Sequence, residues 1–310
     1  MKKLFPFMLL LVLALTACGP AASPPEADSG DTAIIATTYP VYLFACAVTE
    51  GAEGYDVTLM IDQPVSCLHD YTLSVSDMRT LERADVIVMN GAGLEEAMED
   101  ALDAVAGTPV IDCSAGIELL EGEEHHHEEA GEDDHHEGDP HIWMDPELAC
   151  VMIGNLAEGL SALDPDSAPR FSANAQAAAE KVRAACGEMK ARLADLSCRE
   201  LITFHDGFHY FARAFDLTIL RAIEEEAGSE ASAREVSAIV EEIETHGLPA
   251  VFTEVNGSAA TAEMIARECG VAVVPLDLIM SRSDPDELPG LDAYLARLSR
   301  DVSAIQEAYS

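Results

Sequence analysis

The chain has 310 residues, of which 49% are hydrophobic, so it can form a substantial core. This length predicts two domains of ordinary size rather than one. Its 57 acidic side chains against 17 basic ones give a formal net charge of −40, which would be repelled by a phosphate backbone. The composition therefore argues against nucleic acid as a partner and favours a protein that attracts cations.

The first 17 residues have the features of a signal peptide. Lys2 and Lys3 precede a short apolar run over residues 9–15, too short to span a bilayer stably. The segment Leu15-Thr16-Ala17-Cys18-Gly19 looks like a bacterial lipobox, in which the cysteine is diacylated and becomes the mature N-terminus. Residues 18–32 are rich in Ala, Ser, Pro and acid and predict a flexible tether. We therefore expect an exported protein anchored at Cys18; the alternative is a plain secretory signal.

The first half of the mature chain alternates strand-like and helix-like runs, which predicts parallel βαβ units. Ser76 is expected to cap the second helix. The expected strands cover residues 33–37, 57–61, 86–89 and a run starting at 110, and the expected helices cover 41–48, 76–83 and 94–105.

Residues 118–139 break this pattern. The segment holds 11 acidic residues and 5 histidines but no Lys or Arg, so it is expected to be a mobile loop. Its histidines form two groups: His125, His126 and His127, then His135 and His136.

The second half begins with helices and then resumes the alternation. A helix over 146–163 is followed by a long Ala-rich helical run that suits a rigid spacer. We predict an N-terminal lobe over 33–167, a linker helix over 168–197 and a C-terminal lobe over 198–310. The expected strands cover 200–204, 217–220, 250–253 and 271–274, and the expected helices cover 232–245, 259–269 and 291–308.

Seven cysteines remain after Cys18, an odd number that leaves at least one without an intramolecular disulfide partner. An exported protein can form disulfides, but the spacing does not fix their pairing. The absence of a Cys-x-x-Cys pair argues against a cysteine-rich structural zinc site.

Polar side chains follow several of the expected strands. His205, Glu254 and Asp277 each lie just beyond a strand of the second half, whereas His69 and His141 belong to the first. Ligands bind beyond the carboxyl ends of parallel strands. A lone histidine there is more often structural, but three histidines and a carboxylate brought together would form a tetrahedral site that suits zinc.

At these residues the chain resembles the zinc and manganese substrate-binding lipoproteins of bacterial ABC transporters, the cluster A-I or ZnuA-like family. The resemblance covers nearly the whole mature chain in the right order. The matching pieces are Ser66-Cys67-Leu68-His69-Asp70-Tyr71 with Ser76-Asp77 and Ala84-Asp85, Asn90-Gly91, Asp139-Pro140-His141-Ile142-Trp143-Met144-Asp145-Pro146, Thr203-Phe204-His205-Asp206-Gly207-Phe208-His209-Tyr210-Phe211, Phe252-Thr253-Glu254 and Pro275-Leu276-Asp277.

This resemblance implies an α/β fold: two lobes of parallel-sheet βαβ units joined by one long rigid helix, with the metal site in the interlobe cleft. By carry-over, His69 and His141 come from the first lobe, and His205 and Asp277 come from the second. A histidine at the position of His205 resembles the zinc binders, where a glutamate resembles the manganese binders. An additional imidazole favours Zn(II) over Mn(II).

Several residues around this site leave alternatives open. Ser66-Cys67-Leu68 precedes His69 where many relatives have a Pro or Glu-Pro, and for Cys67, two residues from His69, a disulfide is favoured over metal ligation. His209 would share a helix face with His205 and is an alternative ligand, although a position at the rim is favoured. Glu254 would orient a ligand histidine or ligate itself. The histidines of the 118–139 loop are expected to gather zinc weakly, and Asp145 and Asp206 are further candidates for supporting ligands.

The sequence therefore predicts an extracytoplasmic lipoprotein that captures Zn(II) and delivers it to an ABC permease, acting as a monomer and not as an enzyme. One alternative is a manganese or iron importer, or an adhesin, of the same fold. The alternative from another class is a zinc hydrolase, which would need an open coordination position and a general base. The lack of a His-Glu-x-x-His motif argues against that class.

Overall fold

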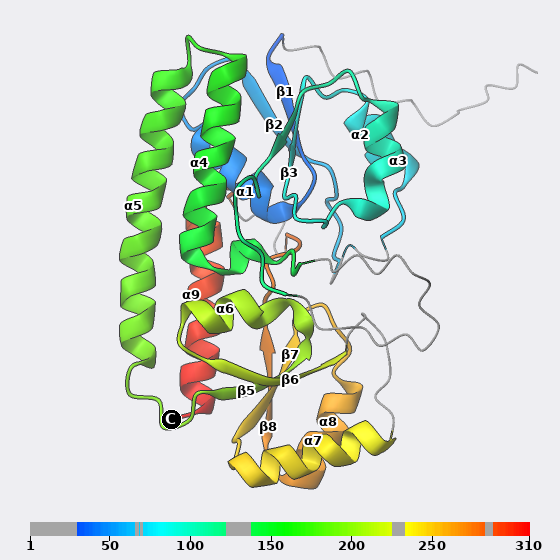
Figure 1. Ribbon diagram of the computed structural model, residues 1–310, viewed down its shortest axis with the longest axis vertical. Coiled ribbons are helices and arrows are strands. Elements are labelled where there is room, and N and C mark those ends of the chain that lie inside the picture. The colour runs from blue at the N-terminus through cyan, green and yellow to red at the C-terminus, as the bar shows by residue number, and fades with distance from the viewer. Residues whose placement is uncertain (1–29, 66–67, 69–70, 122–137, 225–232, 283–287) are drawn as a thin grey trace, which may run out of the picture. The chain divides into compact units, whose positions relative to one another are not determined.

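A computed structural model gives the structure of the chain (Figure 1). It describes residues 30–65, 68, 71–121, 138–224, 233–282 and 288–310. Residues 31–310 form one compact unit.

The N-terminal lobe is built on a four-stranded parallel sheet with the order β2-β1-β3-β4. β1 and β3 are central, and their apolar runs are buried, as expected for a parallel sheet covered on both faces. The strands are β1 (Thr32–Ala36), β2 (Tyr55–Leu59), β3 (Val86–Met89) and β4 (Val110–Asp112).

The C-terminal lobe repeats this architecture with a second four-stranded parallel sheet, in the order β6-β5-β7-β8. β5 and β7 are central and almost entirely buried. The strands are β5 (Glu200–His205), β6 (Thr218–Glu224), β7 (Ala250–Glu254) and β8 (Ala272–Leu276). The fold class predicted from the sequence is confirmed in its two parallel-sheet lobes.

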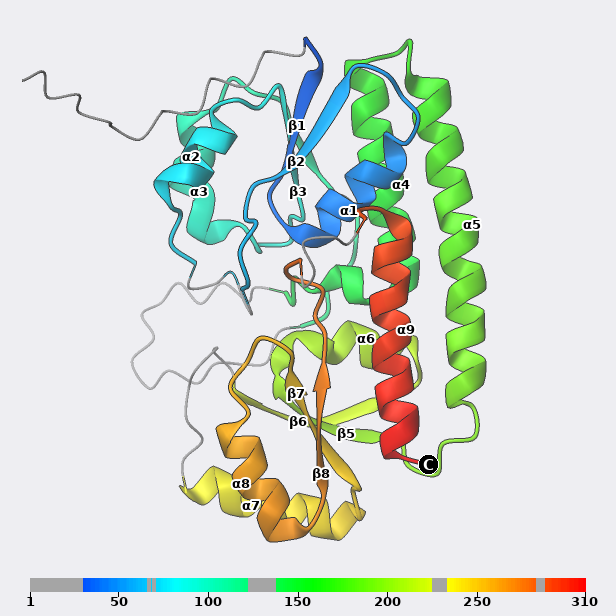
Figure 2. The same ribbon diagram turned by 180° about the vertical axis from the view of Figure 1, so that it is seen from behind.

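Three long helices pack together beside the sheets (Figure 2). α4 (Pro146–Leu163) lies against α5 (Ala168–Leu193), and α5 also contacts α9 (Leu291–Ala308). α5 is the helical linker, since β5 of the second sheet begins soon after it ends. α9 returns from the second lobe to contact α1 (Tyr39–Val48) of the first.

The remaining helices of the first lobe are short. α2 (Val75–Leu81) is followed by η1 (Glu96–Met98) and α3 (Glu99–Ala104). α2 begins at a capping box in which Ser74 accepts from the backbone N–H of Asp77 while the Asp77 carboxylate accepts from that of Ser74. The sequence-based choice of Ser76 as the cap was therefore wrong by two residues.

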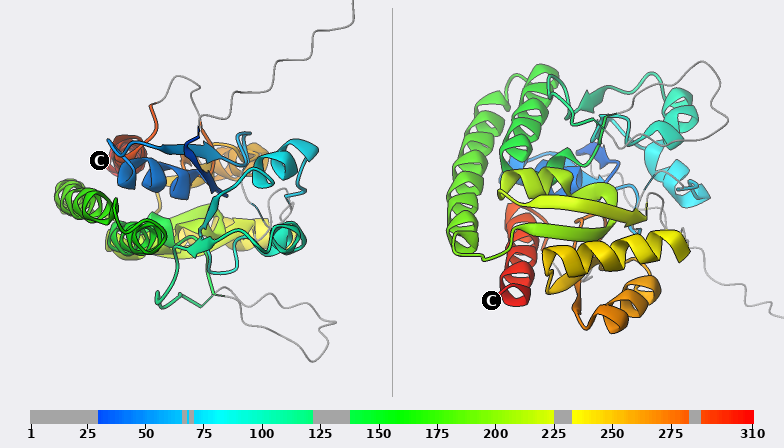
Figure 3. Two further views of the ribbon diagram at one scale, coloured as in Figure 1. Left: turned by 90° about the horizontal axis from the view of Figure 1, so that it is seen from above. Right: turned by 60° about the horizontal axis from the view of Figure 1, so that its bottom comes forward.

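In the second lobe, η3 (Asp206–Phe208) and α6 (His209–Ala214) follow β5, while α7 (Ala233–His246) and α8 (Ala260–Cys269) pack side by side (Figure 3). Residues from α7, α8 and the buried face of the sheet form a small apolar cluster. A larger core cluster continues from the first sheet through the long helices to α9. Trp143, the sole tryptophan of the chain, lies fully buried within it.

Six cysteines lie in the described part of the chain, and all are free thiols: Cys46, Cys113, Cys150, Cys186, Cys198 and Cys269. Burial raises the pKa of Cys46 and of Cys150 to about 11. It also raises the pKa of the Cys113, Cys186 and Cys269 thiols. Cys67 and Cys18 lie outside the described residues.

Within the residues that the structure places, no helix combines the length and apolar character needed to cross a bilayer.

Candidate metal site

Three of the predicted residues lie at the carboxyl ends of adjacent strands of the C-terminal sheet. His205 ends β5, Glu254 ends the neighbouring β7, and Asp277 directly follows β8. All three side chains are buried. His141 precedes η2 (Ile142–Met144) and is also buried. His69, Cys67 and all five loop histidines lie outside the described residues, so their placement stays a prediction.

The imidazole of His141 is oriented by Asp139. Its Nδ1 lies 2.7 Å from Asp139 Oδ1, which also accepts the backbone N–H of His141 at 2.9 Å. An ionised carboxylate only accepts, so Nδ1 carries a proton, and in the neutral imidazole the lone pair is on Nε2. Metal-binding histidines are commonly braced in this way, because the carboxylate fixes the tautomer and raises ligand basicity.

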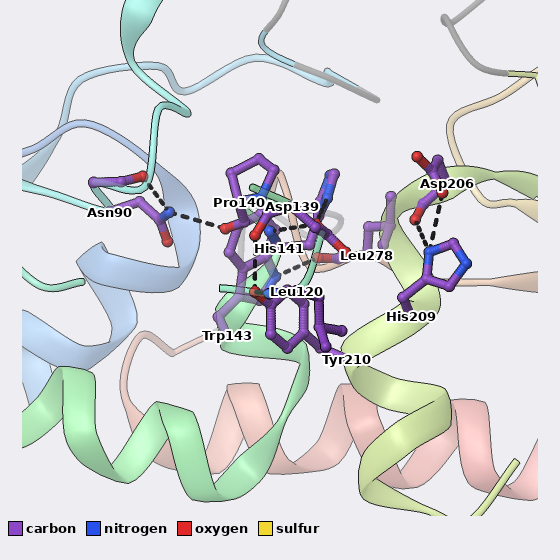
Figure 4. Close-up of polar contacts among 11 residues, drawn as sticks. Asn90, Leu120, Asp139, Pro140, His141, Trp143, Asp206, His209, Tyr210 and Leu278 are labelled. Carbon is purple, nitrogen blue, oxygen red and sulfur yellow. Dashed lines mark hydrogen bonds and ion pairs between the residues drawn. The ribbon is translucent and has the colours of Figure 1, made fainter. Parts of the chain in front are cut away.

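Both lobes anchor the segment around His141 (Figure 4). Asn90, after β3, donates to the carbonyl of Pro140 at 3.1 Å, and Tyr210, on α6, donates to that of Asp139 at 2.9 Å. The indole N–H of Trp143 donates to the carbonyl of Leu278 at 2.8 Å. These contacts hold the His141 backbone in one position relative to both sheets.

The rings of His141 and His205 meet edge to face, with centroids 5.4 Å apart. Gly207 makes room for this approach. A Cβ at position 207 would lie 2.8 Å from His141 Cδ2, 2.9 Å from His141 Nε2 and 2.8 Å from Leu278 Cδ2. Gly207 was not identified from the sequence, because its importance depends on a contact with a residue 66 positions away.

The carboxylate of Asp277 is engaged by its own surroundings. Oδ1 accepts the backbone N–H of Ile279 at 2.8 Å, and Oδ2 lies 3.3 Å from Arg297 Nη1. Ile279 has a φ of 60°, which is unusual for a β-branched residue, so packing around this buried side chain enforces the turn.

In the portion of the chain that the structure describes, no three His, Cys, Asp or Glu side chains are close enough together to hold a metal ion.

His209, the alternative ligand, is occupied by another partner. Its Nδ1 lies 3.0 Å from Asp206 Oδ1, and this bond raises the pKa of His209 to about 9. The imidazole is therefore protonated at neutral pH, and a protonated imidazole has no free nitrogen lone pair with which to coordinate a metal. This pairing favours the rim position over ligation for His209.

Asp145, a further candidate support for the ligands, has a different role. Its Oδ1 accepts the backbone N–H of Glu147 at 2.9 Å and so caps α4. Its Oδ2 accepts from Arg213 Nη2 of α6 at 2.9 Å. Asp145 therefore ties the first lobe to the second.

A buried carboxylate supports the loop that carries Asn90. Glu95 Oε1 accepts from Thr37 Oγ1 at 2.7 Å and from the N–H of Asn90 at 2.8 Å, and Oε2 accepts from the N–H of Gly91 at 3.0 Å. Burial raises the pKa of Glu95 to about 7 despite these bonds. Glu95 was not identified from the sequence as part of this support.

The raised pKa of Glu95 predicts a pH-dependent contribution to stability. The pKa of Glu95 in the folded protein lies above the ordinary 4.5. The contribution of Glu95 to the free energy of unfolding is therefore fully present below pH 4.5 and is lost as pH rises through about 7. For metal-free protein, the unfolding free energy of wild type minus that of Glu95→Gln should fall by about 2 kcal/mol between pH 5 and 8. Urea unfolding at both pH values measures this difference. A difference that stays constant with pH would contradict it.

A family model described as "ZnuA: Zinc-uptake complex component A periplasmic" matches residues 34–308. The chain belongs to the ZnuA family. The match runs from β1 to α9 and includes all four predicted ligand positions.

Individual relatives agree with the ZnuA family assignment. "High-affinity zinc uptake system protein ZnuA" of Bacillus subtilis (strain 168) is 28% identical over 303 residues, covering 96% of this chain and 94% of that protein. "Zinc-binding protein AdcA" of Streptococcus pyogenes serotype M6 is 26% identical over 325 residues. The chain aligns over 98% of its own length but spans 62% of the length of that relative. A solved structure described as "Crystal structure of ZnuA" has a TM-score of 0.77 and 27% identity, covering 90% of this chain and 100% of that one.

Proposed function

We propose that this chain is an extracytoplasmic lipoprotein that captures Zn(II) and delivers it to an ABC permease. The observation that carries the proposal is the meeting of two buried histidines from different lobes, His141 and His205. The Asp139 carboxylate leaves Nε2 of His141 available for a metal. The printed names of the Bacillus and streptococcal relatives, which refer to zinc uptake and zinc binding, support the same function.

The proposed ligands are His69, His141, His205 and Asp277. Three imidazole nitrogens and one carboxylate oxygen suit the tetrahedral preference of zinc, and nitrogen donors favour Zn(II) over the harder Mn(II). Glu254, buried at the end of the strand next to His205, is a candidate for orienting a ligand imidazole. The loop histidines, His125 to His127 with His135 and His136, would gather zinc weakly before it reaches this site.

Delivery to a permease takes place at a membrane, and a lipid anchor would keep the protein there. We propose that Cys18 carries the lipid and that residues 18–32 form the tether, with a lobe at 33–167, a linker at 168–197 and a lobe at 198–310. The protein would then act as a monomer on the extracytoplasmic face of the cell membrane. The relative from Streptococcus pneumoniae serotype 4, named "Zinc-binding lipoprotein AdcA", supports this anchoring.

Metal analysis tests the proposal directly. The protein is purified without affinity tags or chelators, its metal content is measured by mass spectrometry, and zinc and manganese affinities are determined by competition. We expect one tightly bound zinc ion per chain and much weaker manganese binding. Retention of manganese or iron in place of zinc would instead support an importer of those metals.

A further inference from the structure

Arg297, on α9, has a fully buried guanidinium. Its Nη1 donates to the carbonyl of Ser281 at 2.7 Å and lies 3.3 Å from Asp277 Oδ2. Its guanidinium carbon stands 4.9 Å from the ring centre of Tyr39, on α1 of the first lobe. A fully buried arginine is uncommon and needs a partner charge, which Asp277 supplies here.

α9 also fixes the backbone of Asp277. Asp301, one helical turn after Arg297, accepts the N–H of Asp277 at 3.0 Å through Oδ1. Ile279 donates to the other carboxylate oxygen of Asp277. The position of Asp277 is therefore set by two residues of α9 and by its own turn.

We propose that Arg297 is a positioning residue that competes with the bound metal for the carboxylate of Asp277, which lowers zinc affinity and speeds zinc release. This inference rests on the proposed function, in which Asp277 is a zinc ligand. The guanidinium holds the carboxylate while the site is empty, and zinc must weaken that contact to bind. Release then returns the carboxylate to a partner already in place.

Electrostatics gives the direction of the effect. Without Arg297, the metal-free protein keeps a buried carboxylate with no cation beside it, whereas in the zinc complex the metal neutralises that carboxylate. Removing Arg297 therefore destabilises the metal-free state more than the zinc complex, which tightens binding by linkage. Loss of a positive charge near Zn(II) acts in the same direction. Freer rotation of Asp277 opposes both effects, but it costs less than an unpaired buried charge.

The test compares zinc dissociation constants and release rates of wild type, Arg297→Met and Arg267→Met. Arg267, on α8, has an exposed side chain and provides the control. We expect Arg297→Met to bind zinc about tenfold more tightly and to release it more slowly, and Arg267→Met to match wild type. In the Asp277→Asn background, Arg297→Met should tighten zinc binding by a clearly smaller factor, because only the through-space repulsion between the guanidinium and zinc remains there.

A merely structural role gives a different pattern. It predicts weaker binding in Arg297→Met by the same factor in both backgrounds, and that result would overturn the inference, as would an unchanged affinity. If Arg297→Met does not fold, Arg297→Gln is compared with Arg297→Lys; the neutral variant should bind more tightly than the charged one, and equal affinities would again overturn it. Failure of wild type itself to bind zinc would refute the proposed function instead.

Discussion

Replacing His141 with alanine is expected to raise the zinc dissociation constant at least about a hundredfold, because the change removes a proposed ligand, and the contacts that support a ligand alone are worth ten- to a hundredfold. Nε2 of His141 is the nitrogen left available by the Asp139 bond, and no other group of this residue can replace it. Competition with a chelator measures the affinity. Trp143, whose ring centre lies 5.3 Å from that of His141, provides a fluorescence signal for zinc addition.

Three companion variants make this experiment specific. His246→Ala removes a histidine paired with Glu200, at the opposite end of β5 from His205, and should leave zinc affinity unchanged. Asp139→Asn should weaken binding about tenfold by loosening the His141 ring. Deletion of residues 122–137 should leave the dissociation constant within a few-fold of wild type. Equal affinity in His141→Ala and wild type would refute the assignment of His141 as a ligand.

Replacing Gly207 with alanine is expected to weaken zinc binding about tenfold or more, since a misplaced ligand side chain loses much of its contribution. The new methyl group would overlap both His141 and Leu278. The ring of His141 would have to move, and it would then give up either its bond to Asp139 or its approach to His205. The backbone of Gly207 does not adopt a positive φ, so the substitution itself is not conformationally strained.

Gly159→Ala is the matched control for steric crowding. Its Cβ would lie 2.8 Å from Ile111 Cγ2, a comparable overlap at a contact between α4 and β4. Both variants should lose thermal stability, but only Gly207→Ala should lose zinc affinity. Calorimetry of the two proteins with and without zinc separates these effects. Zinc affinity in Gly207→Ala equal to that in Gly159→Ala would show that Gly207 has no special role.

Much of the fold follows from local patterns. The helices expected over 146–163 and 291–308 coincide with α4 and α9, because each has a clear start and a sustained amphipathic repeat. The alternation of apolar strands and helices also predicted both parallel sheets. The α2 cap was misplaced although Ser74 and Asp77 have the Ser-x-x-acid spacing that defines a capping box.

The surroundings of the candidate site were much less predictable. His141 and His205 were named through motifs, but nothing near Gly207 or Arg297 in the sequence indicates what each touches. Arg297 would be placed on the polar side of an amphipathic helix, whereas folding buries it against Tyr39 and Asp277. Such roles depend on contacts between segments distant in the chain, which local periodicity does not encode.

The burial of the free thiols also affects competition for the metal. Thiolate sulfur is an excellent zinc ligand, and it binds only after losing its proton. Burial holds the pKa of Cys46 and of Cys150 near 11 and shifts that of Cys113 upward as well, so these groups stay protonated at neutral pH. Among the cysteines that the structure describes, these three are therefore poor ligands for zinc at neutral pH. The histidine nitrogens do not have to compete with thiolates at these positions for the incoming ion.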